Sequence, residues 1–359
     1  MRQSYLISKP TYCRKRMVSY MIGIRTDAND KIAMGHLVRC MSIARQLRKK
    51  HLEVVFILSE NDAEEFIIEN GFRLICLNNH YDEKEQELAS LLELVRREKI
   101  DRLLIDSYEV TNEYMRRLKE ICKTVYIDDY NQFQYPVDMI VNYTNGADFE
   151  LYRANGYKRE QILLGSKYVP LRPEFAQSRI MIKQDIKSVF LSTGGTDHYN
   201  VMVCLLTKLQ KSQLKDVTKY VITGKFYKYK EELSTLCKQD STICNYHDIQ
   251  DVHSIMCKSD LAITAGGTTL SELCACGIPT ICLSIADNQH SGIKAYAKAE
   301  MIFYAGDIRD KKDKTLENVV CMAEYLKSNE AVRKKMGEKA KKVVDGKGAS
   351  RIADAILNL

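Results

Sequence analysis

The sequence predicts an α/β fold with two domains, each built on a parallel β-sheet wrapped by helices, which face one another across a cleft. Two observations point to this fold. Short apolar runs alternate with helical patterns along both halves of the chain, and the alternation weakens between about residues 145 and 185. Several apolar runs also end in glycine-containing loops that lead into helices. The 359 residues suffice for two such domains with separate cores.

The first half contains six apolar runs of strand length, separated by stretches in which apolar residues recur at helical spacing. The predicted strands span 20–26, 53–59, 72–77, 101–107, 123–129 and 138–144. The predicted helices span 36–50, 63–71 and 83–99. Apolar runs of this kind are typical of strands that are buried on both faces, as in a parallel sheet.

The second half repeats the pattern after a proline-containing connection, "YVPLRPEF" at 168–175. Its predicted strands span 188–195, 219–224, 242–247, 261–267 and 279–285. The predicted organisation is an N-terminal extension (1–19), a first Rossmann-like domain (20–175), a second, nucleotide-binding one (180–345) and a C-terminal helix (346–359). The carboxyl ends of the strands are expected to line the cleft.

Composition excludes several classes of protein. The formal net charge of +7 is too diffuse for a nucleic-acid-binding surface, and it suits an anionic small substrate as well as it suits an ordinary basic surface. The chain has no apolar run long enough for a membrane span and no secretory signal at its start. Its twelve cysteines form no C-x-x-C pairs, so we expect free thiols in a reducing cytoplasm. Nothing in the sequence indicates the oligomeric state.

The most specific segment is "AITAGGTTLSELCACGIPTICLSIADNQ" at 262–289. A predicted strand ends in Gly266 and Gly267, and Thr268 or Thr269 is expected to cap the following helix. A glycine loop that leads into a helix N-terminus presents free N–H groups to an anion, most often a phosphate. Glu272, one turn into the helix, suits hydrogen bonds from ribose hydroxyls, although a carboxylate there also favours the helix dipole without any ligand.

Several blocks in a matching order carry a resemblance to a known family. They are "RTDANDKIAMGHLVRCMSIA" (25–44), "LLIDSY" (103–108), "YIDD" (126–129), "LLGSKYVPLRPEF" (163–175), "LSTGGTD" (191–197), "AGGTTLSELCACGIPT" (265–280) and "DNQ" (287–289). The chain resembles the nucleotide-sugar hydrolases of pseudaminic acid biosynthesis, which have a glycosyltransferase-B-like fold, and the related spore coat polysaccharide proteins. It departs from them at Ser107, where that family commonly has histidine, and at Ala33-Met34, where it often has an extra glycine.

The resemblance implies that His36 is the catalytic residue. Gly35 lets the chain turn tightly and approach a ligand closely. His36 falls at the start of the predicted helix 36–50, where the positive end of the helix dipole favours a neutral imidazole that can accept a proton from water. A structural role, with the ring bonded to a nearby backbone group, is the alternative.

Other polar residues follow the predicted strands and are expected near the same cleft. Arg25, Asp27 and Asn29 follow the first strand, where Asp27 suits a sugar amide or a water but also an ordinary loop cap. Tyr108 is expected to stack on a sugar face, and Arg39 either joins His36 or is solvated. The remaining candidates are Thr193, Gly194 and Gly195 near the diphosphate, Ile249 near the uracil, and Asn288 and Gln289 near the sugar.

The resemblance implies the inverting hydrolysis of a UDP-linked 2,4-diacetamido-2,4,6-trideoxy sugar to UDP and the free sugar, and the predicted phosphate loop and His36 are consistent with it. No metal or cofactor is expected, because a diphosphate is already a good leaving group. Asp128 and Asp129 form no metal motif, and the spacing of His247, His253 and Cys257 does not indicate a metal site. A glycosyltransferase with a UDP-sugar donor and a non-catalytic nucleotide-sugar binder remain the alternatives.

Overall fold

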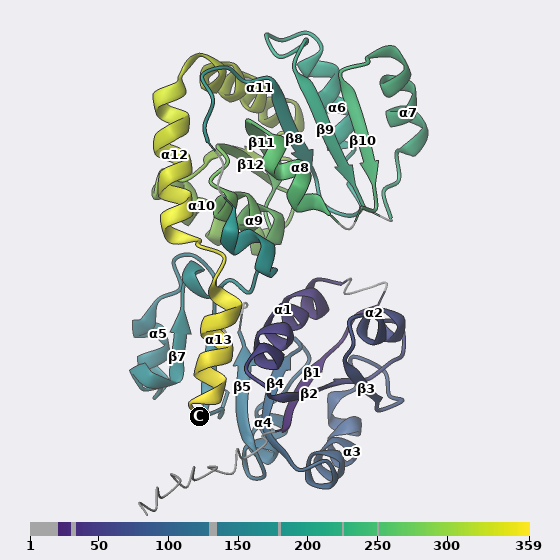
Figure 1. The fold of residues 1–359 in the computed structure, drawn as a ribbon, viewed down its shortest axis with the longest axis vertical. Coiled ribbons are helices and arrows are strands. Elements are labelled where there is room, and N and C mark those ends of the chain that lie inside the picture. The colour runs from purple at the N-terminus through teal and green to yellow at the C-terminus, as the bar shows by residue number, and fades with distance from the viewer. Residues whose placement is uncertain (1–20, 30–33, 129–134, 179–180, 225, 250) are drawn as a thin grey trace, which may run out of the picture.

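Two parallel β-sheets, one of seven strands and one of six, form the framework of the molecule and lie in separate lobes (Figure 1). The structure is a computed structural model, and it describes residues 21–29, 34–128, 135–178, 181–224, 226–249 and 251–359, apart from the side chain of Asn288. The predicted fold class, two α/β units with parallel sheets, is confirmed.

The first sheet contains β1 (Met21–Thr26), β2 (Glu53–Leu58), β3 (Arg73–Cys76), β4 (Ile100–Asp106), β5 (Lys123–Ile127), β6 (Met139–Asn142) and β7 (Ile162–Leu164), in the order β3-β2-β1-β4-β5-β6-β7. Its helices are α1 (Gly35–Lys49), α2 (Glu64–Glu69), α3 (Lys84–Arg97), α4 (Asn112–Lys119) and α5 (Phe149–Ala154), with 3₁₀ turns η1 (Arg159–Gln161), η2 (Ser166–Tyr168) and η3 (Pro173–Gln177). Thr26 pairs with Asp106, so the carboxyl ends of β1 and β4 meet at one edge.

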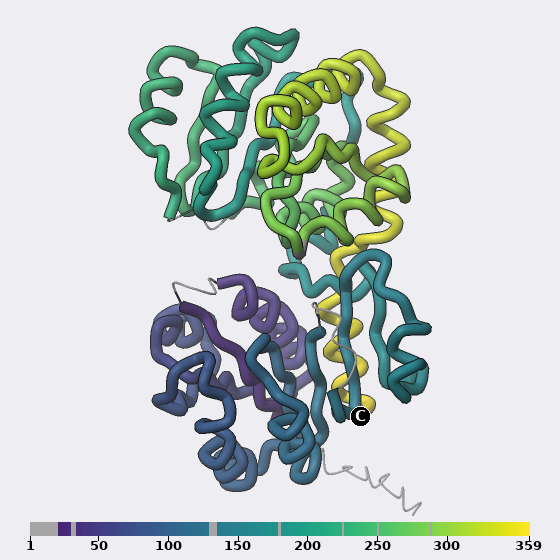
Figure 2. The backbone as a smooth tube through the Cα atoms, turned by 180° about the vertical axis from the view of Figure 1, so that it is seen from behind, coloured from purple at the N-terminus to yellow at the C-terminus, as the bar shows by residue number. Residues whose placement is uncertain are grey.

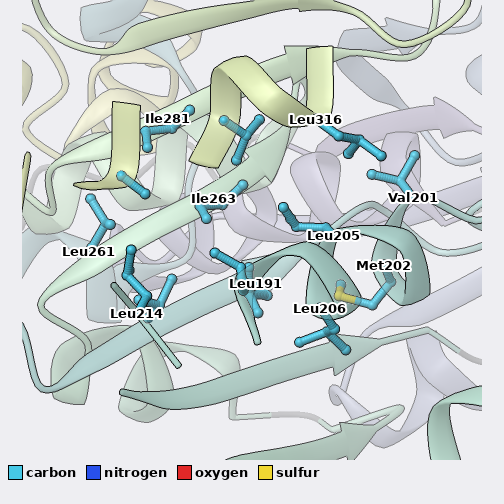
Figure 3. Packing of buried hydrophobic residues seen from close by; sticks show 14 of the residues in the cluster. Leu191, Val201, Met202, Leu205, Leu206, Leu214, Leu261, Ile263, Ile281 and Leu316 are labelled. Atoms are coloured by element: carbon cyan, nitrogen blue, oxygen red, sulfur yellow. The ribbon is translucent and has the colours of Figure 1, made fainter. Parts of the chain in front are cut away.

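The second sheet contains β8 (Ser188–Ser192), β9 (Thr218–Thr223), β10 (Ile243–His247), β11 (Leu261–Ala265), β12 (Thr280–Ser284) and β13 (Phe303–Asp307), in the order β10-β9-β8-β11-β12-β13. Its helices are α6 (Val201–Leu209), α7 (Lys230–Gln239), α8 (Val252–Lys258), α9 (Thr268–Cys276), α10 (His290–Lys298), α11 (Lys312–Ser328) and α12 (Glu330–Val343), with the 3₁₀ turn η4 (Asp287–Gln289). One core cluster joins Leu191 and Ile263 of the strands to Leu205 of α6 and Leu316 of α11 (Figure 3).

The last helix, α13 (Gly348–Leu357), returns to the first lobe and packs against α1, as both views show (Figures 1 and 2). Ile352 and Ile356 are buried in the same apolar cluster as Leu37 and Met41 of α1. The C-terminal helix therefore belongs to the core of the first sheet, although it follows the second sheet in the sequence.

Two strands of the structure, β7 and β13, were not predicted from the sequence pattern. β7 is an edge strand of three residues within the stretch where the alternation weakens, and β13 contains Gly306 and Asp307 and so lacks a continuous apolar run. Several predicted strands also end earlier than expected, as β8 does at Ser192, because their glycine-containing tails are loops. The predicted extension 1–19 lies outside the described residues. No helix in the described part of the chain has both the length and the apolar character that a membrane span requires.

Candidate active site

His36 lies in the first turn of α1, with its ring held by a carboxylate from the neighbouring strand β4. The Nδ1 atom of His36 is 2.7 Å from Oδ1 of Asp106, and both side chains are buried. When Nδ1 carries the proton and donates it to Asp106, the Nε2 atom of a neutral ring is a proton acceptor. Nε2 makes no hydrogen bond to any residue that the structure describes. The ring therefore offers a free acceptor at the carboxyl edge of the first sheet.

Asp106 also accepts hydrogen bonds from Arg39, one turn along α1 from His36. Arg39 Nε donates to Oδ2 of Asp106 at 2.5 Å, and its Nη1 donates to the hydroxyl of Tyr143. Burial alone would raise the pKa of Asp106, but the charge of Arg39 and the hydrogen bonds from Arg39 and His36 outweigh it, and the pKa lies well below its usual range. Asp106 is therefore an anion at neutral pH.

A small cavity of about 20 Å³ adjoins this pair. The Tyr108 ring packs edge-on against the His36 ring, with a centroid distance of 4.5 Å and an interplanar angle of 82°. Asp27 also lines the cavity. The structure thus brings together three of the predicted site residues, His36, Asp27 and Tyr108.

A larger cavity of about 300 Å³ lies beside the small one, and Tyr108 lines both. Its walls come from both lobes and from the connection between them. The lining residues are Arg39, Tyr108, Tyr143, Thr144, Asn145, Val169, Pro170, Gly267, Thr268, Leu270, Ser271, Gln289, Gly292, Ile293 and Tyr296. A cleft between the carboxyl ends of two parallel sheets is where ligands bind in folds of this kind.

The start of α9 faces this cavity. Gly267 is the N-cap residue, with φ of 122°, and no side chain caps the helix, so the prediction that Thr268 or Thr269 serves as the cap is wrong. Gly267 and Thr268 line the cavity, whereas Thr269 does not. The N–H of Leu270 donates to the carbonyl of Gly267 at 3.2 Å, and no side chain caps the helix, so the N–H groups of Thr268 and Thr269 are the first-turn donors available to an anion.

Glu272 lies one turn into α9 and is buried. Burial raises the pKa of this carboxyl group above its ordinary value, and the nearby Arg172 opposes the shift only in part. The Arg172 Nη2 atom is 3.5 Å from Oε1 of Glu272, which makes this a long contact. Glu272 lines neither of the two cavities, although a buried carboxylate with one weak partner retains acceptor capacity for a ligand.

Gln289 lines the cavity, but its side-chain amide already makes hydrogen bonds to the backbone of the neighbouring loops. Its Oε1 atom accepts from the backbone N–H of Ile285 at 3.0 Å, and its Nε2 atom donates to the carbonyl of Gly266 at 3.1 Å. A Cβ atom at Gly266 would lie 2.9 Å from Cβ of Gln289, so glycine is required for this contact. Gln289 therefore positions the glycine loop, and the predicted side chain of Asn288 lies outside what the structure describes.

Arg25 does not line the cleft, contrary to the prediction. Its side chain is fully buried and pairs with Asp27 at 2.8 Å and with Glu87 at 2.7 Å. Asp27 in turn accepts from Lys84 at 2.7 Å and from the backbone N–H of Ser59 at 2.8 Å. Burial opposes ionisation of Asp27, but Arg25 and Lys84 outweigh it and lower the pKa to about 2. These residues form a buried charge network beneath the His36 cavity.

The other predicted residues lie apart from the two cavities. Gly194 and Gly195 follow β8 and are exposed, and Gly194 has φ of 88°. Ile249 follows β10 and packs against an apolar cluster of the second lobe. Gly35 begins α1 without a positive φ, so the turn there does not itself require glycine. Asp128 is fully buried and accepts from the hydroxyl of Tyr152 at 2.9 Å, which is a structural contact.

Sequence reasoning missed Asp106 as the partner of His36, and it also missed Tyr143, Asn145 and Tyr296 in the cavity wall. A signal existed for two of them, because Asp106 ends β4 and Asn145 follows β6 at the same sheet edge. Tyr296 lies on α10 and carries no such signal, since only the packing of the two lobes brings it to the cleft.

No family model matches the chain. An uncharacterized protein of Methanocaldococcus jannaschii is 29% identical over 292 residues, which cover 77% of this chain but 58% of that protein. The spore coat polysaccharide biosynthesis protein SpsG of Bacillus subtilis is 24% identical over 345 residues, covering 94% of this chain and 98% of its own length. The UDP-2,4-diacetamido-2,4,6-trideoxy-β-L-altropyranose hydrolase of Campylobacter jejuni is 22% identical over 250 residues, covering 69% of this chain and 85% of that enzyme.

Solved structures agree with the observed topology. Acinetobacter baumannii MurG superposes with a TM-score of 0.68 at 12% identity, covering 94% of this chain and 100% of that one. The UDP-GlcNAc 2-epimerase of Neisseria meningitidis, bound to UDP-GlcNAc, gives 0.67 at 11% identity with the same coverage. The protein is therefore a distant relative of a spore coat polysaccharide protein and a UDP-sugar hydrolase, and it has the two-domain fold of glycosyltransferase-B enzymes and UDP-GlcNAc 2-epimerases.

Proposed function

We propose that this protein is a nucleotide-sugar hydrolase that converts a UDP-linked 2,4-diacetamido-2,4,6-trideoxy sugar into UDP and the free sugar. The observation that carries the proposal is the His36 ring, held by Asp106 at 2.7 Å beside a cleft between the two lobes. The name of the Campylobacter jejuni relative supports the reaction and the substrate class.

In the proposed reaction, Nε2 of His36 accepts a proton from water while the water oxygen attacks the anomeric carbon. The bond between that carbon and the diphosphate oxygen breaks, UDP leaves with the electron pair, and the anomeric configuration inverts. Asp106 keeps the Nδ1 proton in place and stabilises the imidazolium that forms. A positioned general base of this kind contributes about 10²–10⁴-fold in rate.

The start of α9 is proposed to hold the departing diphosphate. Its first-turn N–H groups lack a side-chain cap, and Gly267 and Thr268 line the cleft. Such preorganised donors stabilise negative charge as it develops on the leaving group. Glu272, one turn further along, is proposed to accept hydrogen bonds from the ribose hydroxyls.

The walls of the cleft support a sugar with both amide and methyl groups. Asn145, Ser271 and Tyr143 provide polar groups, while Leu270 and Ile293 provide apolar contacts. Acetamido substituents and a deoxy position present both kinds of surface. A sugar with hydroxyl groups at every position would leave the apolar wall unmatched.

Incubation of the purified protein with UDP-sugars in the absence of any acceptor tests the proposal. We expect UDP and free sugar in equal amounts from the diacetamido-trideoxy substrate, with UDP-GlcNAc turned over more slowly. NMR at early times should show the inverted anomer. Release of UDP only after an acceptor is added would instead identify a glycosyltransferase. Binding of the UDP-sugar without turnover would identify a non-catalytic binder.

A further inference from the structure

A second group of reactive side chains lies where α8 meets the C-terminal end of α9. His253 and Cys257 are one turn apart on α8, and Cys276 is the last residue of α9. One nitrogen and two sulfur atoms of these side chains lie within 4.8 Å of one another. No other group of three or more His, Cys, Asp or Glu side chains in the described chain meets this criterion. None of the three residues lines either cavity of the candidate active site.

The spacing of these donors is close to that around a tetrahedral zinc ion. Nε2 of His253 is 3.4 Å from Sγ of Cys257. Zinc–nitrogen and zinc–sulfur bonds at a tetrahedral angle require about 3.5 Å between these atoms, and about 3.8 Å between two sulfurs. The sulfur of Cys257 is on an exposed residue, so its side chain can rotate to close the remaining gap.

A fourth position is provided by Ser178, at the end of η3. Its Oγ atom is 2.7 Å from Nε2 of His253 and 3.5 Å from the sulfur of Cys276. The hydroxyl group thus lies between two of the three donors, where a fourth ligand of a tetrahedral site belongs. A water molecule at this position, hydrogen-bonded to the hydroxyl, completes the coordination.

Charge balance also favours a divalent ion. A neutral imidazole and two thiolates carry a total charge of −2, which a divalent cation neutralises. This matters because Cys276 is buried, and an unbalanced charge there would be costly. Two sulfur donors and one imidazole select zinc and other thiophilic metals over magnesium and calcium, which prefer oxygen.

The chemistry of the thiols argues against a reactive cysteine at this place. Burial raises the pKa of Cys276 to about 12, and the partial desolvation of Cys257 also raises its pKa. Redox-sensing cysteines have lowered pKa values, so these thiols lack that property. A bound metal ion, in contrast, displaces the thiol protons itself.

From this geometry we infer that His253, Cys257 and Cys276 form a binding site for a thiophilic divalent cation, of which Zn²⁺ is the best fit. Binding releases one proton from each thiol and forms one metal–nitrogen and two metal–sulfur bonds. The ion ties α8 to the end of α9, the helix whose first turn lines the cleft. The sequence spacing of His253 and Cys257 did not indicate this site, because Cys276 joins them only through the packing of the two helices.

Cobalt(II) binding to the reduced, chelator-stripped full chain tests the site. We expect one equivalent of Co²⁺ to produce thiolate-to-cobalt charge-transfer absorption and the d–d bands of a tetrahedral ion, both abolished by added Zn²⁺. Cys257→Ser should weaken binding by about 100-fold or more, since loss of a second-shell partner alone costs about 10–100-fold. Cys321→Ser, at another exposed free thiol, is the matched control and should bind as the wild type does.

Two results would overturn the inference. One is a fully reduced and folded wild type that shows no thiolate-to-cobalt band. The other is a Cys257→Ser variant with an unchanged spectrum and affinity. Thermal melts and a thiol count on the same samples confirm folding and exclude a disulfide. The readout is independent of sugar turnover, so the site and the proposed hydrolysis fail or succeed separately.

Discussion

The orientation of the His36 ring depends on one carboxylate of a neighbouring strand. Asp106 ends β4, directly beside the end of β1. Its carboxylate lies within hydrogen-bonding distance of both His36 Nδ1 and Arg39 Nε. Because its pKa lies well below the usual range, the carboxylate stays charged and can accept a hydrogen bond from Nδ1–H, the tautomer in which Nε2 of a neutral ring is the acceptor. The arrangement is that of a general base and the group that orients it.

Replacement of His36 by asparagine should lower kcat by about 10²–10⁴-fold, the usual contribution of a general base. Binding of UDP should persist, because the proposed phosphate site belongs to the second lobe. Steady-state kinetics and calorimetry measure the two effects. His51→Asn is a matched control, since His51 is exposed and has φ of 62°, which asparagine tolerates. A His36 variant within threefold of the wild type would show that the ring is structural.

Replacement of Glu272 by glutamine should weaken UDP binding by about 1–3 kcal/mol at neutral pH. In the wild type, burial raises the pKa of Glu272 above the ordinary value of 4.5. The carboxylate is the acceptor, so UDP affinity should fall as the pH drops through this raised pKa, and the glutamine variant should lose that dependence. Calorimetry between about pH 5 and 8 measures both effects.

Glu174→Gln is the control for this experiment, because Glu174 is the other carboxylate beside Arg172, at 3.3 Å. It should leave both the UDP affinity and its pH dependence unchanged. An unaltered affinity in a folded Glu272 variant would remove this residue from the nucleotide site.

At the scale of elements, two helices begin with glycines whose requirements differ. Gly267 has φ of 122°, a backbone conformation that residues with a side chain rarely adopt. It is the N-cap of α9, at the edge of the cleft. Gly35 starts α1 without a positive φ, and a Cβ atom there would meet nothing within 4 Å. The backbone conformation at Gly267 therefore requires glycine. At Gly35 neither the backbone nor a neighbouring residue requires it, so a glycine there matters only if a ligand approaches closely.

Gly267→Ala should destabilise the protein by about 1–3 kcal/mol, the cost of a strained backbone conformation, or else shift the loop and weaken UDP binding. Gly35→Ala should leave stability unchanged or raise it by up to about 1 kcal/mol, because alanine favours helix. Urea unfolding and UDP titration of both variants measure this difference. Equal stability and equal UDP affinity for Gly267→Ala and the wild type would contradict the assigned role.

At the scale of the whole molecule, the chain ends in the lobe where it begins. After α12 it crosses back, and α13 packs against α1 and completes the core of the first lobe (Figure 1). The first lobe therefore depends on residues that follow the entire second lobe. This crossing gives the two lobes a second covalent connection, besides the one near 165–187, and it couples their positions across the cleft.

Ile352→Ala should cost about 2–5 kcal/mol in the free energy of unfolding. The reason is that Ile352, on α13, is fully buried in the apolar core of the first lobe. Ile68→Ala, at a position that is 54% exposed, should change it by no more than about 0.5 kcal/mol. Thermal or denaturant unfolding of the two variants provides the measurement. A cost at Ile352 no larger than that at Ile68 would mean that α13 is dispensable for the first lobe.

The sequence by itself determined the fold class, most of the strands, the helix that begins beside His36, and the fact that a helix follows the Gly266-Gly267 loop, although not the residue that caps it. These features are local, because the period of apolar residues and the preferences of glycine act within a few residues. The same locality explains why His36, Tyr108 and Thr268 were expected near a cleft and lie beside one. Each follows or precedes a strand end, and strand ends of parallel sheets gather at one edge.

Only the tertiary structure decided which residues meet. The register of β1 and β4 pairs His36 with Asp106, and the neighbouring β2 and α3 draw Arg25 away from the cleft into a buried network. The packing of α8 on α9 brings Cys276 to His253. These contacts join residues up to 70 positions apart. No local pattern encodes them, because they depend on which strands become neighbours and which helix faces touch once both sheets have formed.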